Sequence, residues 1–165
     1  MAKLEVRQLV EAIAGSGADV VSIGGVAVIL IGGEHYTKDV DFAFSRKRES
    51  LKKIVEALAP YHPKPVDWPE GVPFVWDDQT LQGMTTITLD TDIGRIDFLA
   101  EPDGAPPYDD LRSRAIPFDL EGVTIYVACI EDLIAMKRAA GRPKDLAHIA
   151  ELETIQRLMR EEADN

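Results

Sequence analysis

Two aspartates inside an apolar run, preceded at a fixed distance by a pair of glycines, constrain this chain more than any other feature. A glycine pair at 24–25 opens an apolar segment, a second pair at 32–33 ends it, and Asp39-Val40-Asp41 follows. This order predicts a turn, a short helix, a loop and a β-strand. Asp39 and Asp41 are expected on one face of that strand, because side chains alternate. Two like charges beside a core favour a cation between them, and a metal ion is the simplest partner.

A later strand carries a third carboxylate. The runs 84–90 and 95–100 flank turn residues and predict a hairpin. In the second run Asp97 alternates with apolar residues, as Asp41 does. Asp97 either pairs with Arg95 on a solvated sheet face or serves as a further metal ligand.

The glycine pair, thirteen intervening residues and Asp-x-Asp resemble the signature of the DNA polymerase beta-like nucleotidyltransferase superfamily. Residues 37–42 look like the small bacterial nucleotidyltransferases of the abortive-infection toxin type. The resemblance implies that Gly24 and Gly25 open a helix that approaches a nucleoside triphosphate. It also implies that Asp39 and Asp41 hold Mg²⁺ or Mn²⁺.

The toxin-type resemblance extends to residues 133–146. In those proteins a helix lysine and a downstream acidic residue line the nucleotide site. Lys137 matches the lysine, Asp145 is the nearest acidic candidate, and Arg142 is a weaker candidate for offsetting triphosphate charge. A lysine on an apolar helix stripe otherwise reaches for solvent. The superfamily's third acidic residue also lies on a later strand, and Asp97 resembles it, so we favour a metal role for Asp97.

These groups suit nucleotidyl transfer, in which an acceptor attacks the α-phosphorus of a nucleoside triphosphate and pyrophosphate leaves. Divalent ions held by carboxylates stabilise the entering and leaving oxygens together. The resemblance implies a toxin-type enzyme acting on tRNA or another macromolecule, with a cognate antitoxin protein as partner. In similar enzymes a residue at the position of Thr37 is phosphorylated to silence the enzyme. A threonine that only orders the loop before the strand explains Thr37 equally well.

Two other functions stay open. One is the same chemistry on a small acceptor, such as an aminoglycoside or lincosamide antibiotic, and the other is a non-catalytic relative that binds nucleotide or a partner protein. The net charge of -11 argues against a general nucleic-acid surface and mildly favours a cationic antibiotic over tRNA. Against a non-catalytic role, the carboxylates and the lysine are all present.

Composition and patterning bound the remainder. Cys129 is the only cysteine, which excludes an internal disulfide and a cysteine-based metal site. No apolar run is long enough to span a bilayer, so we expect a cytoplasmic protein with no membrane partner.

The expected fold class is α/β (α+β), a nucleotidyltransferase fold with a mixed sheet flanked by helices. One domain is expected over residues 1–165, with a C-terminal helical part from about 130 to 165. The last helix, 144–160, is expected to face the body with Leu146, Ile149, Leu152, Ile155, Leu158 and Met159. Its lone histidine, His148, reads as structural. Five prolines between residues 60 and 73 predict an irregular loop that could overhang a site.

Overall fold

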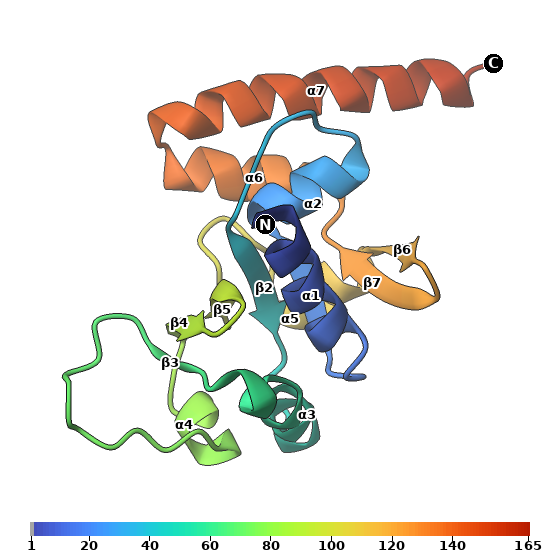
Figure 1. Cartoon of the computed structure of the whole chain (residues 1–165). Helices are drawn as coiled ribbons and strands as arrows, with labels where there is room; N and C mark the ends of the chain where they lie inside the picture. Colours follow the sequence, from blue (N-terminus) through green and yellow to red (C-terminus); the bar gives the residue numbers. More distant parts are fainter. Residues whose placement is uncertain (1) are drawn as a thin grey trace.

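One seven-stranded sheet forms the centre of the structure (Figure 1). The computed structural model describes residues 2–165, with side chains from residue 6 onward. The strands are β1 Val20–Ile23, β2 Val40–Phe44, β3 Lys64–Pro65, β4 Thr86–Thr91, β5 Gly94–Leu99, β6 Ile116–Leu120 and β7 Val123–Val127. They lie in the order β3-β4-β5-β2-β1-β7-β6. The pairs β2–β5 and β1–β7 are parallel and the other neighbours are antiparallel, so the sheet is mixed as predicted.

Helices flank this sheet and also build one end of the molecule. They are α1 Ala2–Ala14, α2 Gly24–Ile31, α3 Arg48–Leu58, α4 Asp78–Gln82, α5 Tyr108–Ser113, α6 Ile130–Ala140 and α7 Pro143–Ala163, with a 3-10 turn η1 Ala59–Tyr61. α1 packs across β2, β5 and β7, whereas α6 and α7 pack side by side and contact α2 (Figure 1). None of the described helices is both long and apolar enough to cross a lipid bilayer. The architecture confirms the predicted α/β class with helices at the C-terminal end.

Aromatic rings from β2 and β5 fill the centre of the core. Val40, Phe42 and Phe44 are buried on β2, and Phe98 is buried on β5. The Phe98 ring lies 6.2 Å from Phe42, nearly parallel to it, and 6.0 Å from Phe44 in an edge-on contact. Stacked and edge-on pairs at these separations add to the free energy of burial. Aromatic contacts in the core therefore join the two strands that carry Asp41 and Asp97.

Glycines begin and end α2 as the sequence predicted. Gly24 has a φ of 75° and turns the chain directly from β1 into α2, and Gly32 ends the helix with a φ of 131°. Both angles lie in the region that glycine adopts without strain. Residues 33–39 then form an irregular segment before β2 begins at Val40. Asp39 was predicted inside the strand, but it precedes the strand because sheet pairing starts only at Val40 and Asp41.

The proline-rich segment 60–73 extends from the end of the sheet away from α6 and α7 (Figure 1). It contributes the short β3, which pairs with β4. The Trp68 indole donates to the carbonyl of Val72, and the Trp76 indole to that of Val55, each at 2.9 Å. The indole N–H group of each tryptophan is thus bonded within its own part of the structure.

The inward face of α7 is narrower than predicted. Leu152 is fully buried, but Leu146, Leu158 and Met159 are exposed. At the start of the helix Asp145 takes the inward position next to Leu146 and is itself fully buried. At the other end α7 extends past α6, so its last turns have no helix to pack against (Figure 1). The predicted contact of Leu146, Leu158 and Met159 with the body is wrong for these reasons.

The aromatic core gives a stability prediction. Phe98→Ala is expected to lower the free energy of unfolding by about 3–5 kcal/mol, because it removes a fully buried ring. Urea unfolding followed by circular dichroism measures the change. Val75→Ala is the control, since Val75 is 64 % exposed and its truncation should change stability little. Equal losses in the two variants would contradict this description of the core.

Candidate active site

Two aspartates face each other across neighbouring strands. Asp41 of β2 and Asp97 of β5 are direct partners in the parallel register, and both are half-buried. Neighbouring strands lie about 4.8 Å apart, so the two carboxyl groups leave the same face of the sheet side by side. Arg95 pairs with Asp90 at 3.1 Å. The alternative of an Asp97–Arg95 pair is therefore wrong.

Positive charge offsets this pair of carboxylates only weakly. The pKa of Asp41 is raised to about 7, first by burial and then by the carboxylates of Asp97 and Asp39, while Lys137 acts in the opposite direction. Asp97 Oδ1 is buried without a hydrogen-bond partner among the described residues. An all-oxygen site of this charge fits a hard divalent cation such as Mg²⁺.

Asp41 and Asp97 would supply only part of such a coordination shell. Within residues 2–165 no group of three or more His, Cys, Asp or Glu side chains is arranged to hold a metal by itself. Asp39 is exposed beside the pair. Mg²⁺ is commonly bound through one or two carboxylates together with substrate phosphates and water. The donor set fits an ion that arrives with its nucleotide.

The glycine pair makes room for the acidic strand and the loop before it. A Cβ at Gly24 would collide with the Asp41 carboxylate, and one at Gly25 would lie 2.6 Å from Thr37 Oγ1. Any larger residue would displace these side chains. Gly24 and Gly25 also begin α2, where backbone N–H groups favour anions. The sequence predicted only this second role.

A buried acid holds two cations at the junction of α6 and α7. Asp145 Oδ2 accepts from the Arg142 backbone N–H at 3.0 Å and from its Nε at 2.9 Å, and Lys137 Nζ lies 3.5 Å from Asp145 Oδ1. Burial raises the pKa of Asp145, but the bonds and charges of Arg142 and Lys137 outweigh it and hold the pKa below its ordinary value. Burial lowers the pKa of Lys137 against the pull of Asp145. Asp145 thereby fixes where Lys137 and Arg142 point.

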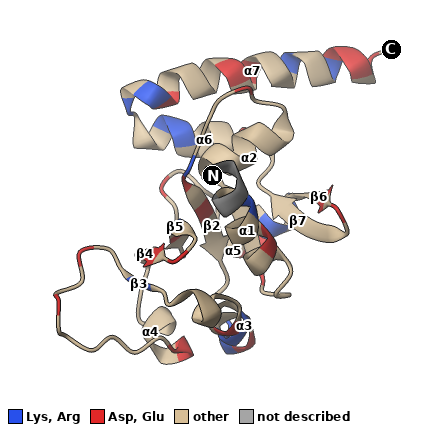
Figure 2. Cartoon of the chain, viewed as in Figure 1, with Lys and Arg blue, Asp and Glu red and all other residues tan. Residues whose placement is uncertain are grey.

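These groups surround one cavity of about 780 Å³, within the range of small-molecule sites. The predicted residues that line it are Gly24, Gly25, Thr37, Asp39, Asp41, Asp97, Lys137 and Arg142. Asp145 does not line the cavity and influences it only through its contacts with Lys137 and Arg142. Figure 2 shows basic segments near the α6–α7 turn and an acidic segment at the start of β2. Residues 60–73 are not among the lining residues, so the predicted overhang is wrong.

Two histidines belong to the same cavity and were not predicted there. His35 and His148 stack with ring centroids 4.3 Å apart and planes inclined by 27°. Burial, with Lys137 and His35 adding to it, lowers the pKa of His148. His148 follows Asp145 by three residues on the same helix, so helical spacing could have identified it. His35 lies in an irregular segment, where no periodic pattern marks it.

Comparison with solved structures shows a shared fold. The lincosamide antibiotic adenylyltransferase LnuA, in its lincomycin-bound form, is 16 % identical, with a TM-score of 0.58 over 93 % of this chain and 97 % of that one. A Thermotoga maritima protein assigned as a nucleotidyltransferase is 15 % identical, with a TM-score of 0.51 over 98 % and 96 % of the two chains. No curated protein matches the sequence.

The sequence itself matches a family model over residues 3–162. That family is described as a nucleotidyltransferase of unknown function (DUF6036). The match covers almost the whole chain, including the glycine pair, the three aspartates and the α6–α7 cations. The chain therefore belongs to this nucleotidyltransferase family.

Proposed function

We propose that this chain transfers a nucleoside monophosphate from a nucleoside triphosphate to an acceptor in a reaction that requires Mg²⁺ or Mn²⁺. The observation that carries the proposal is the apposition of Asp41 and Asp97 with one oxygen of Asp97 lacking a partner among the described residues. A bound divalent cation would supply charge stabilisation for the entering and leaving oxygens. Asp39, Asp41 and Asp97 are the residues proposed to hold it.

The cations around the cavity suit the triphosphate. Lys137 reaches the cavity from α6. The ion pair with buried Asp145 holds its ammonium group in one place. Arg142 shares the same acid and lines the same cavity. Gly24 and Gly25 let the backbone at the start of α2 approach the phosphates. Together these groups would offset the charge that pyrophosphate carries away.

In the proposed step an acceptor oxygen forms a bond to the α-phosphorus as the bond to the bridging β-phosphate oxygen breaks. Asp97 is proposed to orient the attacking hydroxyl or take its proton, since one of its oxygens is uncommitted. Pyrophosphate leaves towards Lys137. The acceptor keeps the nucleoside monophosphate.

The acceptor we propose first is a macromolecule, with the 3′ end of tRNA as the leading case and a cognate antitoxin protein as partner. This proposal rests on the toxin-type pattern of residues 37–42 and 133–146. Thr37 would be its regulatory position. The Thr37 hydroxyl accepts the Asp39 backbone N–H at 3.1 Å, which fits a threonine that orders the loop before the strand. Regulation by phosphorylation of Thr37 stays a prediction.

A small cationic acceptor is the second candidate, and two observations favour it. The chain has a net charge of -11, which attracts cations and repels nucleic acid. It also shares its fold with a lincosamide antibiotic adenylyltransferase.

The test uses each labelled nucleoside triphosphate in turn, with Mg²⁺, and either total tRNA, an aminoglycoside or a lincosamide. Label is expected in the RNA fraction with wild-type protein and not with Asp41→Asn. Label in an antibiotic would support the second candidate instead. Wild-type protein that transfers no label from any triphosphate to any acceptor would contradict the proposed function.

The metal assignment predicts a binding defect. Asp41→Asn is expected to abolish the heat of Mn²⁺ binding in calorimetric titrations with a non-hydrolysable triphosphate, because an amide cannot replace the carboxylate charge. Asp90→Asn is the matched control, since Asp90 lies on the adjacent β4 but pairs with Arg95 outside the cavity. Unchanged Mn²⁺ binding in Asp41→Asn would rule out the metal role of this residue.

Lys137 is predicted to bind the triphosphate rather than to support the fold. Lys137→Ala should weaken triphosphate binding about tenfold or more. Its melting temperature should stay the same or rise, because burial disfavours the ammonium. Arg138→Ala removes the neighbouring exposed cation, which pairs with Glu153, and should bind normally. A Lys137→Ala protein that melts much earlier would show that the lysine is structural.

A further inference from the structure

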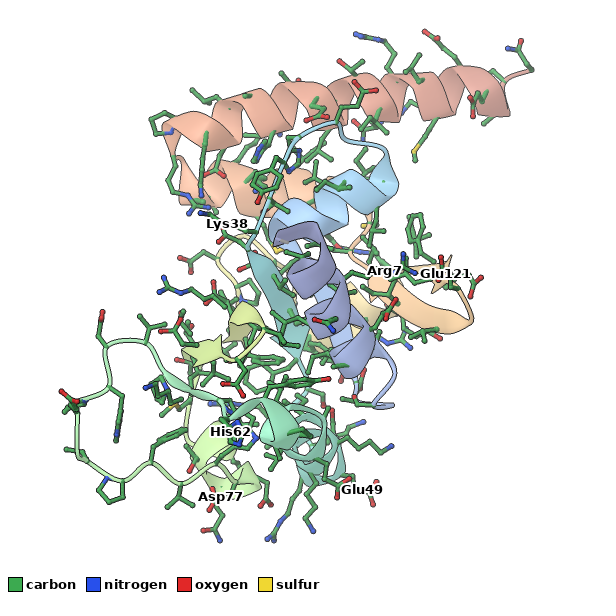
Figure 3. The ribbon with its side chains drawn as sticks, viewed as in Figure 1. Arg7, Lys38, Glu49, His62, Asp77 and Glu121 are labelled. Carbon is green, nitrogen blue, oxygen red and sulfur yellow. The ribbon has the colours of Figure 1, made fainter. Side chains whose placement is uncertain are left out.

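The segment 33–39, called the strap below, carries Thr37 and Asp39 but has little support of its own. It leaves the end of α2, rises beside α7 and descends to β2 (Figure 1). Lys38 lies on its descending part, just before β2 (Figure 3). Among the described residues, positions 34–38 make no backbone–backbone hydrogen bond. The strap must therefore be held by side chains from elsewhere.

Contacts from α7 supply that support. A Glu151 carboxylate oxygen, Oε1, accepts the backbone N–H of Glu34, and the other, Oε2, lies 3.5 Å from His35 Nδ1. One turn earlier on α7, His148 stacks on the His35 ring. Gly33 approaches so closely that an added Cβ would lie 3.0 Å from Glu151 Oε1. Two consecutive strap residues, Glu34 and His35, are thus fixed to two residues of one helix, and Gly33 lies close to one of them.

The end of the strap next to β2 carries Thr37 and Asp39 and so connects the α7 contacts to the acidic site. Thr37 Oγ1 accepts the Asp39 backbone N–H at 3.1 Å. Thr37 also fills the space above Gly25, where an added Cβ would lie 2.6 Å from its hydroxyl oxygen. The positions of Thr37 and Asp39 consequently depend on both ends of the strap. The end with Thr37 packs against Gly25 of α2, and the end with Glu34 and His35 contacts α7.

We infer that Glu151 and His148 are positioning residues for nucleotidyl transfer: they hold the strap on α7 so that Thr37 and Asp39 keep their places in the lining of the cavity. This inference rests on the proposed function for its effect on the reaction, but the anchoring itself does not. Neither residue is assigned to the chemical step. Misplacing a reacting or ligating group by about 1 Å can cost on the order of a hundredfold in rate.

The two histidine rings make few hydrogen bonds, so their contribution to anchoring comes from stacking. Both nitrogens of His35 and Nδ1 of His148 are buried without hydrogen-bond partners among the described side chains. The His35–His148 pair is therefore held by ring stacking and by the contact of His35 with Glu151, and not by a network of hydrogen bonds. A ring at position 148 should suffice for the stack, whereas an acceptor oxygen at 151 is required.

The experiment compares variants that keep or remove each contact. Glu151→Ala and His148→Ala should speed hydrogen exchange about tenfold at the amides of Glu34 and Asp39, the strap amides that donate hydrogen bonds. They should also lower kcat about tenfold, with the KM for triphosphate changed less. Glu151→Gln keeps an acceptor oxygen and His148→Phe keeps a stacking ring, so both should restore most of the protection and rate. Glu153→Ala is the control, since Glu153 lies on the same helix but pairs with Arg138 at 2.7 Å.

Two results would overturn the inference. Unchanged exchange of the strap in both alanine variants would show that α7 does not anchor it. Faster exchange with unchanged kcat would show that anchoring does not matter for the reaction. If wild-type protein transfers no label, the proposed function fails, and Mn²⁺ affinity in the presence of a non-hydrolysable triphosphate replaces kcat as the readout. That affinity should then fall in both alanine variants and recover in Glu151→Gln and His148→Phe; no loss would overturn the inference.

Discussion

Repulsion between Asp41 and Asp97 is the constraint on which the rest of the site depends. The parallel pairing of β2 and β5 sets the two carboxylates opposite each other, and the stacked rings of Phe42 and Phe98 hold that register from the same two strands. The strands cannot slip to relieve the repulsion without exposing the core. Burial, and after it the neighbouring carboxylate of Asp97, raise the pKa of Asp41, and a cation between the two carboxylates would offset the repulsion.

Much of this arrangement is local in the sequence and could be predicted from it. Period-two alternation placed Asp41 and Asp97 inside apolar strands, and the glycines at 24 and 32 marked the ends of α2. Two limits appeared at element ends. Asp39 lies outside β2 because strand pairing starts one residue later, at Val40. The buried stripe of α7 is narrow because this helix extends past its partner α6.

Contacts between distant segments carried the information that the sequence did not reveal. Asp145 was predicted to line the nucleotide site, yet it is buried behind the cavity, where it contacts Lys137 and Arg142. His148 looked structural on its own because His35, its stacking partner, lies far away along the chain. Periodicity reports which face of an element is buried, but not which element covers that face. The two roles of α7, as a holder of cations and an anchor for the strap, became visible only in the folded chain.

The most direct test of the account is to locate the metal. Crystals grown with Mn²⁺ and a non-hydrolysable triphosphate, measured at a wavelength where manganese scatters anomalously, would show the ion as a discrete peak. The account predicts a peak within coordination distance of the carboxylates of Asp41 and Asp97, with the triphosphate extending from it towards Lys137. A peak elsewhere, or an ordered triphosphate in the cavity with no manganese at these two aspartates, would contradict the account.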